Sequence, residues 1–189
     1  MTTIPFRKRL MIAITDTIRA VTPANGYTHD LSDFDPGDGT PMARVYRGRA
    51  WFGESDPLPM VSILEAASPA DPVADEPEYT PASEYEVILL VQGWAQDDKL
   101  NPTDPAYDLM CDVRKALAAE RSRMAPLAVT GGRHIKDPFG LWSQGAKNRI
   151  IDIKVGPGVV RPADDVSAKA YFWLTLKVQL VDHADAPFS

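Results

Sequence analysis

The chain has 189 residues and a formal net charge of −6, and 44% of its residues are hydrophobic. This length favours a single domain over residues 1–189 whose core needs no metal or disulfide to hold it together. The lone Cys111 excludes an internal disulfide and a multi-cysteine metal site, and the negative charge argues against bulk attraction to nucleic acid or membranes. No apolar run reaches membrane-spanning length and no continuous apolar signal core is present, so we expect a protein made and kept in a cytoplasm.

The first third of the chain predicts one helix and two strands. An amphipathic helix is expected over residues 4–21, because apolar side chains recur at every fourth position. Alternation predicts strands over 43–52 and 60–66, and the spacer Gly53–Pro59 suits a hairpin loop between them. In the first strand we expect one face to carry Val45, Arg47, Arg49 and Trp51, and the other to carry Tyr46, Gly48, Ala50 and Phe52.

The rest of the chain predicts three more strands and a second helix. Residues 85–94 form an expected central strand, because four consecutive apolar residues in it face both ways. A helix is expected over 105–120, with a buried stripe of Tyr107, Met110, Val113 and Ala116 or Leu117. A short strand is expected over 149–155. The clearest strand is 168–181, in which one face carries Phe172, Leu174, Leu176, Val178 and Leu180, and the other carries Tyr171, Trp173, Thr175, Lys177 and Gln179.

This order of elements predicts the fold class. Strands come mostly as antiparallel neighbours, and the helices are inserted between groups of strands rather than alternating with them. We therefore expect an α+β fold with a mostly antiparallel or mixed sheet of about four or five strands, packed with two main helices and carrying long loops.

Two inserted loops segregate charge. Residues 67–84 are acidic and proline-rich, which predicts a solvated loop, whereas 121–149 are rich in glycine and basic residues and predict a flexible basic loop. Solvation is the leading interpretation of the acidic loop. The separation of charge also raises the hypothesis that the basic loop contacts the acidic loop of a neighbouring copy, or an acidic surface on another partner. The candidate interface residues are Arg47, Arg49, Asp75, Glu76, Glu78, Arg133, Lys136 and Lys147. The arginines of 43–52 could equally protect an exposed sheet edge from aggregation.

No catalytic or metal-binding constellation can be assembled from these residues. Cys111 is far in sequence from His29, His134 and His183, and is interpreted as a partly buried helical residue. The histidines lack metal-ligand spacing, and Gly131-Gly132 is not followed by the rest of a phosphate-binding loop. We therefore expect no catalytic residue, no metal and no cofactor.

The series of segments resembles a known family. It comprises the opening helix ending at Asn25-Gly26-Tyr27, the strands Val45-Tyr46-Arg47-Gly48-Arg49 and Leu58-Pro59-Met60-Val61-Ser62-Ile63, the strand Tyr85–Val91, the helix start Asp104-Pro105-Ala106-Tyr107-Asp108-Leu109-Met110, and a long last strand. This arrangement, which covers 4–66, 85–120 and 165–181, is similar to the tail terminator, or tail completion, proteins of long-tailed bacteriophages. No single motif carries the resemblance, and the two charged loops depart from the family's compact form.

The resemblance implies a structural virion protein of the tail and neck, assembled in the host cytoplasm. Such proteins form a ring, usually a hexamer, on the head-proximal end of the tail tube. The ring stops tube growth and presents a surface for head–tail joining. The implied partners are further copies of the chain, the tube protein and a connector or stopper protein, and DNA would pass through the lumen without sequence-specific binding. The alternatives are another neck protein, a stopper or adaptor, or a small cytoplasmic enzyme or ligand-binding domain.

Overall fold

The computed structural model describes residues 4–53, 55–66, 82–145, 149–164 and 167–183. The helices and strands are, in chain order, α1 Phe6–Arg19, β1 Val45–Arg47, β2 Met60–Glu65, β3 Ala82–Trp94, α2 Asp104–Ala119, α3 Leu127–Thr130, β4 Ile150–Val155, β5 Val159–Arg161 and β6 Tyr171–His183. Short 3-10 turns lie at Pro23–Asn25, Glu120–Ser122 and Pro138–Gly140. Within these ranges, none of the helices combines the length and apolar character needed to cross a bilayer.

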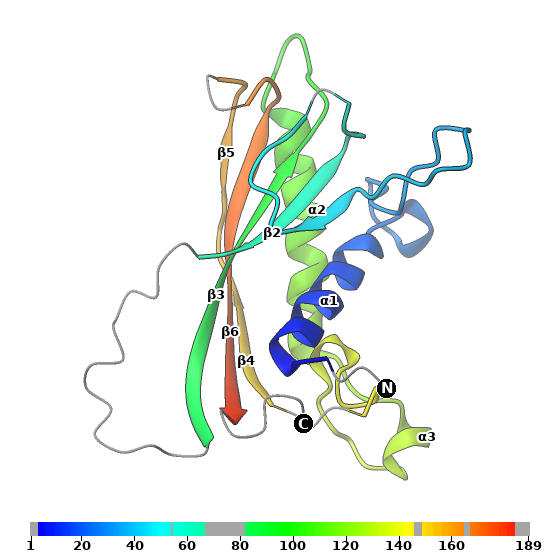
Figure 1. Cartoon of the computed structure of the whole chain (residues 1–189), viewed down its shortest axis with the longest axis vertical. Helices are drawn as coiled ribbons and strands as arrows, with labels where there is room; N and C mark the ends of the chain where they lie inside the picture. Colours follow the sequence, from blue (N-terminus) through cyan, green and yellow to red (C-terminus); the bar gives the residue numbers. More distant parts are fainter. Residues whose placement is uncertain (1–3, 54, 67–81, 146–148, 165–166, 184–189) are drawn as a thin grey trace, which may run out of the picture.

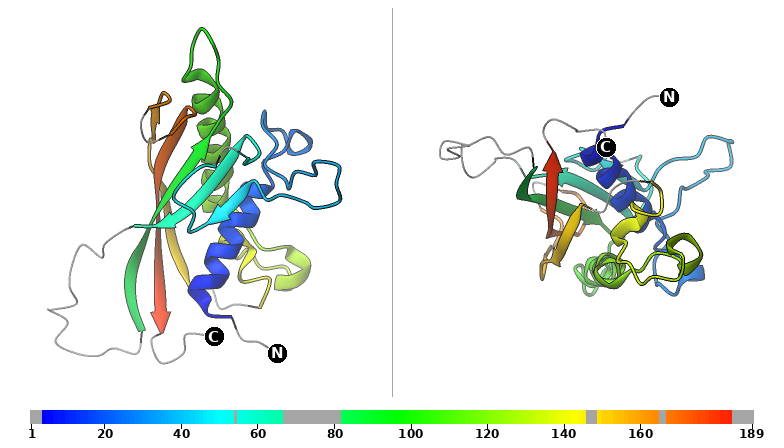
Figure 2. Two further views of the ribbon diagram at one scale, coloured as in Figure 1. Left: turned by 45° about the horizontal axis from the view of Figure 1, so that its top comes forward. Right: turned by 90° about the horizontal axis from the view of Figure 1, so that it is seen from below.

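A single mixed sheet forms one layer, and α1 and α2 cover one of its faces (Figures 1 and 2). The strand order is β1-β2-β3-β6-β4, and β5 also pairs with β6. The predicted α+β class, the mixed sheet and the two main helices are therefore confirmed. The sheet has six strands rather than four or five, because β5 resumes pairing with β6 just after Gly158 turns the chain with a φ of 78°.

The long strand β6 runs through the middle of the sheet. It pairs with β3 along its whole length, from Tyr171 opposite Trp94 to His183 opposite Ala82. On its other side β6 pairs with β5 from Tyr171 to Trp173 and with β4 from Leu176 to Leu180. We call the Trp94 end, where β1, β2, β3, β6 and β5 lie together, the upper half (Figure 1). Of the strands that the structure describes, the lower half contains β3, β6 and β4.

The core lies between the helices and the sheet. The predicted inward face of β6 is confirmed, because Phe172, Leu174, Leu176, Val178 and Leu180 are all buried. The predicted stripe of α1 is confirmed in the same way by Phe6, Leu10, Ile14 and Ile18. In α2 the expected stripe is confirmed at Met110, Val113, Ala116 and Leu117, and is wrong at Tyr107. Ala106 and Leu109 are buried whereas Tyr107 is half exposed, and Cys111 lies on the exposed side of the helix rather than partly buried.

The prediction for β1 was wrong in length and in pairing direction. The strand ends at Arg47 because Gly48 adopts a φ of 75°, which turns the chain out of the sheet. β1 then pairs parallel to β2, with Val45 opposite Val61, instead of forming an antiparallel hairpin. A parallel pair needs a crossover of about a dozen residues, and segment 48–59 supplies it.

Candidate protein-binding surface

The upper half of the sheet carries aromatic side chains on the face away from the helices. The strand register places Met60, Trp94 and Tyr171 side by side on this outer face. Their chain neighbours Val61 and Phe172 point into the main core, because side chains alternate along a strand. The predicted outward face of β6 thus begins with Tyr171, which is nevertheless buried.

Segment 48–59, of which residues 48–53 and 55–59 are described, folds over these side chains and creates a second, smaller core. Phe52 stacks on Trp94 with ring centroids 6.3 Å apart, and Leu58 packs against the same cluster. As a result Met60 and Trp94 are almost fully buried although they lie on the outer face. The crossover that makes β1 and β2 parallel therefore also closes the upper half on its second face.

Arg49 is held between two aromatic rings at the rim of this core. Its guanidinium lies 4.7 Å from the centre of the Tyr46 ring and 4.4 Å from that of Trp51. It also forms an ion pair of 2.6 Å with Asp56, whose carboxylate accepts the Gly53 N–H. The expectation that Arg49 and Tyr46 lie on opposite faces was wrong, because the strand has already ended at Arg47.

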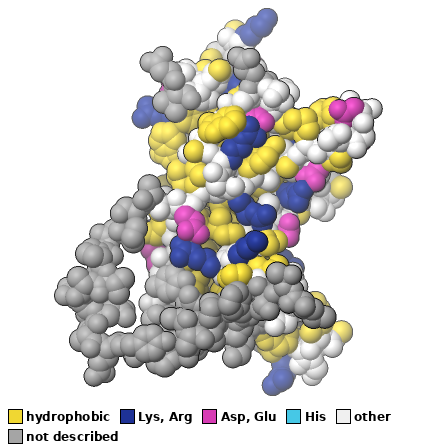
Figure 3. Space-filling view, viewed as in Figure 1, with side chains coloured by type: hydrophobic (Ala, Val, Ile, Leu, Met, Phe, Trp, Pro, Cys, Tyr) yellow, Lys and Arg dark blue, Asp and Glu magenta, His cyan; other side chains and the backbone are white. Residues whose placement is uncertain are grey.

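The rim remains open to solvent. Trp51 is 63% exposed, and on the far side Arg161 lies 6.0 Å from the centre of the Trp173 ring. We call this set the aromatic–arginine surface: Tyr46, Arg49, Trp51, Phe52, Trp94, Arg161, Tyr171 and Trp173. Figure 3 shows hydrophobic side chains interleaved with basic ones over the upper part of the molecule. Tryptophan, tyrosine and arginine dominate the energetics of protein–protein interfaces, so this composition is typical of a binding surface.

Tyr171 ties the surface to the turn before β6. Its hydroxyl donates a hydrogen bond of 3.0 Å to Asp164 Oδ2. Burial raises the pKa of the Tyr171 hydroxyl, and the bond to the Asp164 carboxylate raises it further. Tyr171 therefore stays neutral at physiological pH and acts as a fixed donor.

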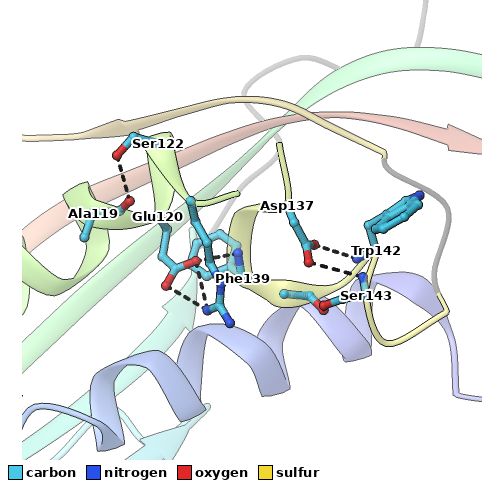
Figure 4. Close-up of polar contacts among 9 residues, drawn as sticks. Ala119, Glu120, Ser122, Asp137, Phe139, Trp142 and Ser143 are labelled. Atoms are coloured by element: carbon cyan, nitrogen blue, oxygen red, sulfur yellow. Dashed lines mark hydrogen bonds and ion pairs between the residues drawn. The ribbon is translucent and has the colours of Figure 1, made fainter. Parts of the chain in front are cut away.

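The segment predicted to be a flexible basic loop is organised by two buried carboxylates (Figure 4). Glu120 accepts the Phe139 N–H at 2.6 Å and pairs with Arg123 at 3.2 Å. Asp137 is 1% exposed and accepts the N–H groups of Trp142 and Ser143. The described part of this segment is thus a folded turn packed on α1 and α2. The carboxylates of Glu120 and Asp137 hold it by accepting hydrogen bonds from its backbone N–H groups.

Two predicted interface residues lie on the outer rim of this turn. Arg133 and Lys136 are exposed, and Lys136 forms an isolated antiparallel bridge with Met124. Phe139, by contrast, is buried and has a φ of 58°, an unusual conformation for a residue with a side chain. The Glu120 carboxylate receives its N–H and so supports this conformation.

A polar groove lies between α1, the end of α2 and this turn. Its volume is about 360 Å³, and alanines of the two helices line it together with Asp16, Thr17, Glu120, Arg123 and Gln144. Glu120 and Arg123 pair with each other there. Across the described ranges, no group of three or more His, Cys, Asp or Glu is placed to hold a metal ion.

The remaining predicted interface residues divide into two groups. Arg47 is exposed at the end of β1, beside the aromatic–arginine surface, and Arg49 belongs to that surface. Asp75, Glu76, Glu78 and Lys147 lie outside the described residues. The acidic segment was expected to extend to Glu84, but β3 already begins at Ala82, so Glu84 is a strand residue.

Sequence reasoning missed the aromatic–arginine surface and the two carboxylates. A signal for the first existed, because Tyr171 and Trp173 are large aromatic residues at positions expected to face solvent. A signal for Asp137 also existed, because Asp before Pro is typical of a residue whose side chain caps the following turn. Comparison of the chain with protein-family models and with curated protein sequences gives no match.

Proposed function

We propose that this chain is a tail terminator of a long-tailed bacteriophage, a structural virion protein that caps the head-proximal end of the tail tube as a ring. The ring ends tube polymerisation, since its outer face does not copy the face of the tube, and it offers a surface for head–tail joining. The mechanism is physical and requires interfaces rather than catalytic groups. It operates in the tail and neck of the virion after assembly in the host cytoplasm.

The observation that carries this proposal is the solvent-exposed rim of the aromatic–arginine surface, where Trp51 is 63% exposed. Arg49 is immobilised by Tyr46, Trp51 and Asp56, so little conformational entropy is lost when a partner covers it. Trp51 projects beside it as a large exposed anchor. A rigid arginine next to an exposed tryptophan supports binding of another protein, which the tube protein or a connector protein would supply.

A second neck function, as a stopper or adaptor, uses the same surface and differs only in the partner. An enzyme or ligand-binding domain would need convergent, available polar groups in the groove beside α1. Glu120 and Arg123 in that groove are already used to hold the Phe139 turn. The surface therefore favours an assembly protein over a small-molecule site.

The test is the mass of the purified protein in solution, alone and with tubes of the candidate tube protein. A closed ring, or a monomer that forms rings only on tube ends, is expected. Trp51→Ala should weaken tube-end binding at least tenfold, whereas Leu127→Ala, which removes a similarly exposed apolar side chain from α3, should not. A monomer or dimer that ignores tubes contradicts the proposal, and binding to a connector protein alone would favour the stopper or adaptor.

A further inference from the structure

Among the described residues, the lower half of the sheet has an unpaired edge on each side. β2 pairs with β3 only from Leu89 to Trp94, so the stretch from Ala82 to Ile88 has β6 on one side and no described strand on the other. β4 likewise pairs with β6 alone. Figure 2, seen from below, places β3 and β4 at the two margins of the three strands.

Both edges present backbone groups that can accept another strand. Ala66 N–H donates to Ile88 O, so the Ile88 backbone points away from β6. Because this direction alternates along a strand, the N–H and C=O groups of Glu86 and Glu84 point outward as well. On β4, Gly156 N–H donates to Thr175 O, so the backbone groups of Val155 and Ile153 point outward by the same rule.

The two edges match in length, direction and charge. β4 has six residues, and the open stretch of β3 is similar in length. Both strands run antiparallel to β6 and hence parallel to each other. The β3 edge carries exposed Glu84, and also Glu86, whose carboxylate pairs with Lys177 of β6. The β4 edge carries exposed Lys154, and also Asp152, which pairs with Arg121.

We infer that the open edge of β3 in one copy pairs with the edge of β4 in the next copy, and that this pairing is the subunit contact of the ring. The inference rests on the proposed function and names its partner, a second copy of this chain. Because the two edges are different surfaces, the contact is heterologous and repeats around the ring until it closes. When the ring axis runs along the strands, the rotation that relates neighbouring copies leaves the strand direction unchanged. β3 of one copy and β4 of the next therefore pair in parallel.

Exposed strand edges normally attract other chains and are commonly blocked by charge. Here Glu84 on one edge and Lys154 on the other repel the same edge of another copy and attract the opposite edge. This charge pattern selects the pairing of β3 with β4 over the pairing of an edge with its own copy. In this inference, the contact predicted between an acidic and a basic region of neighbouring copies is made by strands β3 and β4 rather than by the two loops.

The test is disulfide formation between neighbouring copies. In a Cys111→Ser background, Glu86→Cys combined with Lys154→Cys places one thiol on each edge, and Glu86→Cys combined with Lys99→Cys is the control with the same number of thiols. Oxidation of protein assembled alone or on tube ends should give a ladder of covalent oligomers for the edge pair only. A ladder of equal strength from the control pair overturns the inference.

Charge reversal gives an independent readout. Glu84→Lys or Lys154→Glu alone should lower the fraction of assembled protein severalfold, and the two together should restore much of it. If rings form but the edge cysteines do not cross-link and the reversals leave assembly unchanged, the pairing of β3 with β4 is wrong while the ring stands. If no ring forms under any condition, the proposed function fails together with this contact.

Discussion

The upper and lower halves of the sheet share β3 and β6 but differ in how they are covered. In the upper half, segment 48–59 and the aromatic side chains form a second core on the outer face. In the lower half the outer face carries polar pairs such as Lys177 with Glu86, which lie 2.8 Å apart. The difference teaches that a crossover segment can bury both faces of a sheet at one end, while the other end of the same strands keeps an outer face and edges exposed to solvent.

The largest expected effect tests whether the upper half holds the fold together. Phe172 is fully buried against Gly93, where an added Cβ would lie 2.2 Å from the phenyl ring. Phe172→Ala should lower the free energy of unfolding by about 3–5 kcal/mol through lost burial and a cavity. Val178→Ala in the lower half should cost less, since it removes fewer buried atoms. Urea unfolding of both variants checks this order, and an equal or larger loss for Val178→Ala would contradict it.

A smaller effect is expected where the folded turn meets the helices. Glu120→Ala leaves the buried Phe139 N–H without its acceptor, which should cost about 1–3 kcal/mol. The loss should be local, so amide exchange within 120–143 should accelerate more than exchange in the upper half of β3. Ser122→Ala, which removes only an exposed bond to the Ala119 carbonyl, is the matched control. Uniform acceleration across the sheet would show that the turn is not a separate local unit.

The smallest effect concerns pH and the upper half alone. The pKa of Tyr171 is raised, so its neutral form stabilises the fold below the tyrosine pKa of the unfolded chain, about 10. That contribution is lost as the pH rises through the higher folded value. Tyr171→Phe should cost about 1 kcal/mol at neutral pH and lose less stability than the parent chain above pH ~10. Unfolding curves from pH 8 to 11 measure this, and parallel curves for the two proteins would refute it.

The sequence predicted the parts of the fold that depend on periodicity. The stripe of α1 and the alternation of β6 follow from the spacing of apolar residues, and both were confirmed. The direction of β1 could not be predicted in this way, because it depends on Gly48 turning the chain and on segment 48–59 packing across the sheet. Alternation describes faces within a strand and contains no information on which strand lies beside it.

The candidate surface was predicted only in part, for a similar reason. Arg47 and Arg49 were singled out by their charge, but the rings that hold Arg49 come from positions on both sides of Gly48. Glu120 was not recognised as an organising residue, because its contact with the turn is to the backbone N–H of Phe139. Asp137 was recognisable only through its position before a proline, which does not say which N–H groups it binds. A hydrogen bond from a side chain to a backbone N–H is hard to predict from the sequence, because nearly every residue type has that N–H.

The full-length pairing of β3 with β6 has a mechanical consequence. Both strands have thirteen residues, and β6 reaches from the aromatic–arginine surface to the open edges. Their inter-strand hydrogen bonds lie across the strand direction. A pull along the strands therefore loads this ladder in shear, so that many bonds resist together instead of opening one after another as in a zipper. Tension applied at one end of the molecule is therefore transmitted to the other end by the paired strands β3 and β6.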